Sequence, residues 1–126
     1  MIPRFRAWDK ETKSMNGMAE IYRNRNQEIE LHPRDENIIL MQSTGLIDNN
    51  GKEIFEGDII AINLEGLETP ITAKVFQNRK IGILMFHAFE DDEDVPMVEL
   101  LEGNSVEFAI IGNIWEHPEL AEVSHD

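Results

Sequence analysis

The chain has 126 residues, a formal net charge of −14 at pH 7, 41% hydrophobic residues and no cysteine. This length suits one domain with a modest core, and the lack of cysteine excludes disulfides, thiol catalysis and cysteine-based zinc sites. No run approaches the roughly 18 consecutive apolar residues of a membrane span, and the first residues lack the apolar segment of a signal peptide, so we expect a cytoplasmic protein without membrane contact.

The charge is unevenly distributed along the chain. Residues 1–25 contain six Lys or Arg against three Asp or Glu, whereas residues 90–126 contain twelve acids and no Lys or Arg. A protein that follows a nucleic-acid backbone needs cations to displace counterions, so the net charge disfavours nucleic acid, and only the basic N-terminal third keeps it open. The acidic C-terminal third suits a solvated surface or a basic protein partner.

The first part of the chain predicts a hairpin followed by a loop. Residues 3–8 alternate between apolar and polar positions, which is typical of a strand. The polar residues 9–13 then lead to a returning strand at 14–22. Residues 23–37 are polar and aperiodic, so we expect a long loop there.

The middle of the chain, residues 40–60, predicts two strands separated by tight turns. Asn50 and Gly51 can both adopt positive φ, which is a strong hairpin signal. The sequence Glu56-Gly57-Asp58 then bends the chain into an apolar strand that we expect to be buried on both sides.

The last part predicts more strands and two short helices. Apolar runs at 71–76 and 81–89 flank a four-residue polar link, which suits a second hairpin. The acidic run 90–94 reads as a loop whose last residue, Asp94, can cap a helix at 95–102. Residues 106–115 return to strand character, and Pro118 begins a helical turn at 117–122.

These elements predict a single, mainly β domain with minor α content over residues 1–126. Six or so short strands with polar turns suit a small barrel or a strongly bent antiparallel sheet. Residues 53–64 resemble the turn and core strand of SH3-like barrels. Since this likeness concerns the fold alone, it implies no function.

Three segments in chain order carry a family resemblance. They are Phe5-Arg6-Ala7-Trp8-Asp9, the run 40–60 and the stretch 110–120. Together they resemble the YopX family, small proteins encoded by phages and prophages. The resemblance implies a largely β fold, the cytoplasm of a bacterial host and an accessory role. It supplies no assigned activity, no catalytic residue and no cofactor.

The motif residues are our candidates for an interface. Phe55 and Trp115 stand where such proteins often show tyrosine, so a role of a phenolic hydroxyl would be lost here whereas a packing role survives. The candidates are Phe5, Arg6, Trp8, Asp9, Thr44, Gly45, Asp48, Gly51, Glu56, Gly57, Asp58, Gly112, Asn113, Trp115 and Glu116.

The residue spacing excludes two binding motifs, a phosphate-binding P-loop and a calcium loop. Five residues separate Gly45 from Gly51, and Glu53 stands where a P-loop needs a hydroxyl. A calcium loop that began at Asp48 would place Ile59 at its twelfth position, which requires an acid. The acidic run 90–94 reads as a solvated linker, so we expect no metal site and no cofactor.

The histidines give no clear catalytic or metal arrangement. They stand at positions 32, 87, 117 and 125, and no two share the i, i+4 spacing of a zinc pair on a helix. His87 lies in an apolar strand, where a histidine is most often partly buried. A hydrolase or metal enzyme therefore stays as a second alternative.

The sequence allows two interpretations of Trp8 and Trp115. Both lie in alternating strands opposite the obvious core residues, so they are either interface anchors or buried in a small barrel. Because short open edges of a small sheet are often covered by a neighbouring copy, we expect a homo-oligomer. The sequence thus favours a non-enzymatic, self-associating binding or assembly module, with nucleic-acid binding as the alternative.

Overall fold

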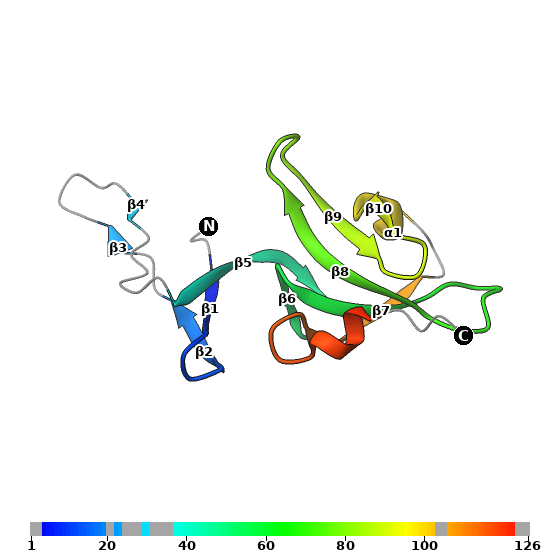
Figure 1. Ribbon diagram of the computed structural model, residues 1–126. Helices are drawn as coiled ribbons and strands as arrows, with labels where there is room; N and C mark the ends of the chain where they lie inside the picture. Colours follow the sequence, from blue (N-terminus) through cyan, green and yellow to red (C-terminus); the bar gives the residue numbers. More distant parts are fainter. Residues whose placement is uncertain (1–3, 20–21, 24–28, 31–36, 103–105, 123–126) are drawn as a thin grey trace. The chain divides into compact units, whose positions relative to one another are not determined.

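The computed structural model describes residues 4–19, 22–23, 29–30, 37–102 and 106–122. The chain divides into two compact units, residues 1–43 and 44–126. Antiparallel strands make up most of both units, as Figure 1 shows. The predicted mainly β fold is therefore confirmed, while the assignment of the whole chain to a single domain stays a prediction.

The first unit is built around a central strand, β1. It contains β1 (Phe5–Asp9), β2 (Ser14–Ala19), β3 (Tyr22–Arg23), β4 (Ile29–Glu30) and the first half of β5 (Ile38–Ile47). β1 pairs with β2 on one side and with β5 on the other, antiparallel to both. β3 and β4 form a separate two-residue ladder, so the segment 23–37, predicted as a loop throughout, contains β4.

The second unit is dominated by one curled sheet. The end of β5 is followed by β6 (Glu53–Phe55), β7 (Asp58–Asn63), β8 (Ile71–Asn78), β9 (Ile83–Ala88), β10 (Glu93–Pro96) and β11 (Glu107–Asn113). Five of these form a sheet in the order β10-β9-β8-β7-β11. The sheet curls into a half-barrel (Figure 1), in agreement with the strongly bent sheet that the turn signals predict.

The core fills one face of this sheet. Strand alternation sends every second side chain inward, and α1 (Val98–Leu101) closes the core with Leu100, together with its N-cap residue Met97. The short strand β6 adds the fully buried Ile54. The buried cluster consists of Ile54, Ile60, Ile62, Ala73, Val75, Phe86, Met97 and Leu100.

The two predicted helices are shorter than expected. Residues 95–96 belong to β10, because Val95 pairs with Phe86 of β9 and continues the sheet. The predicted cap Asp94 also lies in β10, and the N-cap position is taken by Met97 without a side-chain bond. The second helix is a 3-10 turn, η1 (Pro118–Ala121). Among the described residues, no helix is long and apolar enough to cross a membrane.

The acidic run 90–94 is also shorter as a loop than predicted, since Glu93 and Asp94 begin β10. β10 is an edge strand of the sheet, and acidic side chains are tolerated at an edge because they remain hydrated there.

The packing of the core predicts that two isoleucines contribute very differently to the free energy of unfolding. Ile54 is 0% exposed and Ile47 is 61% exposed. We expect Ile54→Ala to lower the free energy of unfolding by about 2–5 kcal/mol, because it leaves a cavity. Ile47→Ala serves as the matched control and should change it by less than about 0.5 kcal/mol. Urea denaturation of both variants checks this, and equal effects would contradict the assigned core.

Candidate functional site

Asp48, at the centre of the family motif, is a buried carboxylate that joins two distant segments. Its Oδ1 accepts hydrogen bonds from the N–H groups of Asn50 (2.9 Å) and Lys52 (2.8 Å). Its Oδ2 accepts one from Ile110 of β11 at 2.9 Å. The neighbouring Asn49 pairs with Phe108 through both backbone and side chain. The loop after β5 is therefore fastened along the outer edge of β11.

The same carboxylate explains the turn that the sequence assigned to Asn50 and Gly51. A hairpin with positive φ at both residues was expected, but only Gly51 has positive φ, at 81°. Gly51 N–H donates to the carbonyl of Asp48, and Asp48 N–H donates to the carbonyl of Lys52. The hairpin between β5 and β6 is thus present, and the side chain of Asp48 sets the conformation of its turn.

The second motif turn, Glu56-Gly57, is held by its neighbours on both sides. Phe55 N–H donates to Oδ2 of Asp58 at 2.8 Å, and Asp58 is only 1% exposed. Gly57 adopts a φ of 86°, donates to the carbonyl of Val75 and accepts from Ile114. The glycine is required here because a side chain would be strained at this φ.

Two further motif residues shape the ends of these strands. Thr44 Oγ1 donates to the carbonyl of Ile54 at 2.7 Å and accepts from the N–H of Leu46. Gly45 between them has a φ of 79°. Oε1 of Glu56 lies 3.4 Å from Nη2 of Arg79 in the β8–β9 turn, and the two side chains form an ion pair.

The motif after β11 forms a compact turn on Asn113. Its Oδ1 accepts from the N–H groups of Trp115 and Glu116, and its Nδ2 donates to the Glu116 carboxylate at 2.9 Å. A Cβ at Gly112 would lie 2.7 Å from Nδ1 of His117. Only glycine therefore lets the chain fold back onto β11 at this point. Trp115 is half-buried.

The N-terminal motif residues lie in the first unit. Asp9 Oδ1 accepts from the N–H groups of Glu11 and Thr12 and so shapes the β1–β2 turn. Trp8 is 6% exposed, which leaves its ring inaccessible as an interface anchor. Arg6 and Phe5 are half-buried, and Nη2 of Arg6 lies 3.6 Å from the sulfur of Met41.

Apart from Arg6 and Trp8 of β1, the polar motif side chains described above hold a turn or a strand end. The structure brings the Glu56-Gly57-Asp58 turn beside the end of β11, since Asp58 pairs with Asn113 and Ile114 N–H donates to the carbonyl of Gly57. The other motif residues lie at other positions in the two units. The part of the motif residues in an interface stays a prediction.

A different set of side chains meets on the outer face of the curled sheet, opposite the core. On β8 the buried Ala73 and Val75 alternate with Lys74 and Phe76, which therefore face outward. In register across the sheet, Lys74 lies opposite His87 of β9, and His87 lies opposite Asp94 of β10.

His87 is held between two carboxylates on this face. Its Nδ1 lies 2.7 Å from Oδ1 of Asp94, and its Nε2 lies 3.3 Å from Oδ1 of Asp92. The ring of Phe89 meets the imidazole edge-on, with centroids 5.6 Å apart. Asp92 adopts a φ of 50° in the β9–β10 turn. The two carboxylates orient the imidazole and hold this turn close to β9.

These side chains border a shallow open groove of about 330 Å³ that is lined by Lys74, Phe76, His87 and Asp94. Nζ of Lys74 lies 5.8 Å from the centre of the Phe76 ring, within range of a cation–π contact. The groove offers one cation, one aromatic ring and carboxylates within a small area. These side chains allow the groove to make both polar and apolar contacts.

The sequence did not identify this groove. His87 was interpreted only as a partly buried strand residue, Lys74 was not singled out, and Asp94 was taken as a helix cap. The run 71–89 predicts the hairpin, but the pairing register that aligns Lys74 with His87 cannot be obtained from periodicity. Among the residues that the structure describes, no group of three or more His, Asp or Glu side chains could hold a metal ion.

The Asp48 carboxylate predicts a pH-dependent contribution to stability. Burial by itself raises the pKa of Asp48, but bonds from Ile110, Lys52 and Asn50 and the charge of Lys52 outweigh it and hold the pKa below its ordinary value. The ionised form thus stabilises the fold above the unfolded-state pKa of about 3.9, and this is lost as the pH falls through the lower folded-state pKa.

We therefore expect Asp48→Asn to lower the free energy of unfolding at neutral pH by about 1.5–3 kcal/mol, because an amide nitrogen cannot accept these bonds. The difference from the wild type should shrink as the pH falls below about 4. Urea denaturation across this range measures it, with the exposed Asp91→Asn as control. A loss that stays constant with pH would contradict the role of the ionised carboxylate.

Comparison with known proteins identifies relatives of the whole chain. The family model described as YopX protein matches residues 4–122. The crystal structure of protein EF1440 from Enterococcus faecalis is 30% identical and has a TM-score of 0.60, over 97% of this chain and 99% of that one.

Protein yopX from Bacillus subtilis is 18% identical with a TM-score of 0.64, over 97% of this chain and all of that chain. At this identity the likeness shows the fold alone. No curated protein matches significantly. The family match and the agreement in fold with these two structures lead to one conclusion: the chain belongs to the YopX family.

Proposed function

We propose that the protein is a non-enzymatic, self-associating binding module, and that it presents the outer face of β8, β9 and β10 to another copy. The single observation that carries this proposal is the composition of that face. Lys74, Phe76, His87 and Asp94 line an open groove there, and Ile83 on the same side of β9 is 40% exposed, although the opposite face already supplies the core. We extend the proposal to an accessory role in the cytoplasm of a bacterial host, as the resemblance to the YopX family implies.

The strand pattern places apolar side chains on this face. Phe76 of β8, Met85 of β9 and Pro96 of β10 form a row across the three strands, because both outer residues pair with Met85; Phe76 and Pro96 are half-buried and Met85 is only 7% exposed. Ile83, at the start of β9, shares their side of the strand with Met85 and is 40% exposed. Apolar surface of this kind on a small protein is a common feature of interaction sites.

Edge pairing, the route to self-association expected from the sequence, is disfavoured for this sheet. The outer edge of β11 already bonds to the Asp48-Asn49 loop. The outer edge of β10 carries Glu93 and Asp94 and ends with Pro96, which are features that protect edges from pairing. The face of the sheet is therefore the better surface for association.

The polar motif side chains support a non-enzymatic role. Asp48, Asp58 and Asn113 are the buried polar residues among those described, and each is bonded to backbone N–H groups of nearby turns. Their bonding capacity is directed to structure. A binding role needs only that these turns keep the sheet rigid.

A substitution at Ile83 tests the proposed face. We expect the wild type to sediment at a mass above that of the 14.5 kDa chain at micromolar concentration. Ile83→Glu should move it toward monomer, because it puts a charge into an apolar contact. The matched control is Ile47→Glu, another exposed strand isoleucine, which should behave like the wild type. Circular dichroism confirms folding, and a monomeric wild type would refute self-association.

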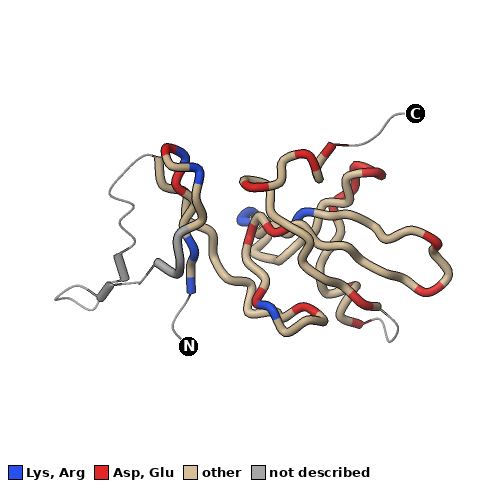
Figure 2. The backbone as a smooth tube through the Cα atoms, turned by 90° about the horizontal axis from the view of Figure 1, so that it is seen from below, with Lys and Arg blue, Asp and Glu red and all other residues tan. Residues whose placement is uncertain are grey.

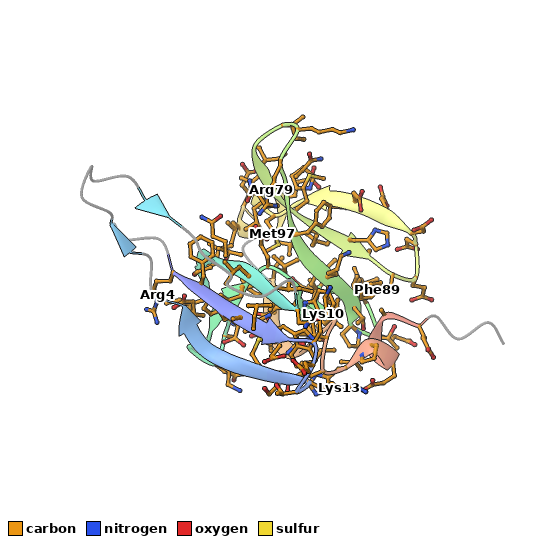
Figure 3. All side chains as sticks on the ribbon, turned by 60° about the vertical axis from the view of Figure 1, so that its left-hand side comes forward. Arg4, Lys10, Lys13, Arg79, Phe89 and Met97 are labelled. Carbon is orange, nitrogen blue, oxygen red and sulfur yellow. The ribbon has the colours of Figure 1, made fainter. Side chains whose placement is uncertain are left out.

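Nucleic-acid binding is the alternative, and it has one supporting observation. Arg4, Lys10 and Lys13 are exposed in the β1–β2 region, where Figure 3 labels them. However, Asp9 and Glu11 lie among these cations, and Figure 2 shows acidic and basic residues mixed on this hairpin. The local charge is therefore weaker than the sequence count for residues 1–25 implies.

We expect no gel shift with single- or double-stranded nucleic acid at low ionic strength, where electrostatic attraction is strongest. A retarded band that disappears on adding salt, and that Lys10→Glu with Lys13→Glu abolishes, would favour the alternative function instead. The matched control for charge is Glu65→Lys with Glu68→Lys, which adds cations to the exposed β7–β8 connection.

A further inference from the structure

We propose that the outer face of β8–β9–β10 pairs with the same face of a second copy about a two-fold axis that runs along β9, so that Lys74 of each copy binds Asp94 of the other. This inference rests on the proposed self-association and names its surface, partner and symmetry. It follows from the strand register and the order of charges across the face.

The face consists of two rows of side chains that cross the three strands. The first row is charged and contains Lys74, His87 and Asp94, in register on β8, β9 and β10. The second row is apolar and contains Phe76, Met85 and Pro96. Adjacent strands lie about 4.8 Å apart. The two ends of each row, on β8 and β10, are therefore roughly 10 Å apart, with β9 between them.

The charged row is of mixed sign, and this determines which partner fits. A uniformly basic segment would meet Lys74, and a uniformly acidic one would meet Asp92 and Asp94. A surface with a cation and a carboxylate at the right spacing matches better, and the row of Lys74 and Asp94 is itself such a surface, with Asp92 as a second carboxylate on its acidic side. Interfaces between identical copies about a two-fold axis require this kind of self-complementarity.

The charges also select the orientation of the axis. A two-fold axis between facing sheets can run across the strands or along them. An axis across the strands would place Lys74 over Lys74 of the second copy, and Asp94 over Asp94, which is repulsive. An axis along β9 exchanges the sides of β8 and β10. It therefore places Lys74 over Asp94 of the second copy at both ends of the charged row.

The apolar row fits the same axis. Phe76 of one copy then faces Pro96 of the second copy, while Met85, which is only 7% exposed, lies between them on β9 and contributes little surface. Packed sheets lie about 10 Å apart, a gap that these side chains can fill from both sides. Ile83 also lies on β9 and hence along the axis.

The contacts within one copy leave the required groups available. Among the residues that the structure describes, Lys74 makes no ion pair, and its Nζ rests over the ring of Phe76. Asp94 uses Oδ1 for His87, which leaves Oδ2 for Lys74 of the second copy. His87 keeps both of its own carboxylate neighbours in this arrangement.

A charge exchange tests this arrangement. Lys74→Asp and Asp94→Lys should each raise the dissociation constant of self-association by about tenfold or more, because each brings like charges together. The variant that carries both changes should return to within about threefold of the wild type. The matched controls are Lys80→Asp on the β8–β9 turn and Glu68→Lys before β8, which make the same charge changes on exposed residues outside the face.

Mixing the two single variants distinguishes a two-fold pairing from other arrangements. Each alone should be mainly monomeric, but a one-to-one mixture should form heterodimers, since both ion pairs are then restored, one in the wild-type direction and one reversed. Sedimentation of the mixture measures this. If the wild type self-associates but the mixture stays monomeric, the two-fold pairing is wrong while self-association stands. If the wild type is monomeric, the proposed function fails as well.

A second measurement remains valid if Asp94→Lys does not fold. The chain has no cysteine, so Ile83→Cys introduces a single thiol next to the proposed axis, where it would meet its own counterpart. Because packed sheets lie about 10 Å apart, too far for a direct disulfide, we expect a bifunctional thiol reagent of about that span to link it into a dimer at micromolar concentration, faster than it links Ile47→Cys, an isoleucine of greater exposure. Equal rates for the two variants would overturn the proposed axis.

Discussion

The buried carboxylate of Asp48 is the constraint on which the second unit depends. It accepts hydrogen bonds from three backbone N–H groups, two in its own turn and one on Ile110, which is 62 residues further along the chain. These bonds shape the turn between β5 and β6, and they occupy the outer edge of β11. A buried carboxylate is stable only when its lone pairs are satisfied in this way. The loop and the strand therefore have to form together. This coupling explains the presence of Asp48 in the family motif.

This constraint also directs where a partner can bind. Because the Asp48-Asn49 loop covers one edge of the curled sheet, and the acids and Pro96 of β10 protect the other, neither edge invites strand addition. The inner face is filled by the core and α1. The outer face of β8, β9 and β10 is what the sheet still offers. The residues that fix the fold and the residues of the proposed interface are thus different sets.

The sequence predicted the fold better than the site, for physical reasons. Turns at Gly51 and Gly57 and the apolar strand at 59–62 follow from local chemistry, and all are present. The helix at 95–102 was predicted too long, because pairing of Val95 with Phe86 overrides a local helical spacing. Asp94 was interpreted as a cap for the same reason. The charged row of Lys74, His87 and Asp94 depends on register between strands, which local patterns do not contain.

Register is also what makes this face specific. A shift of one residue between β8 and β9 would turn Lys74 and Phe76 away from His87 and Met85, and would break both rows at once. The turn of residues 79–82 and the bonds of His87 to Asp92 and Asp94 hold the three strands in their present alignment. His87 therefore acts as a positioning residue, because it keeps the anion of the charged row at a fixed distance from the cation. A surface of so few charges can distinguish its own copy from other acidic or basic proteins only if that distance is maintained.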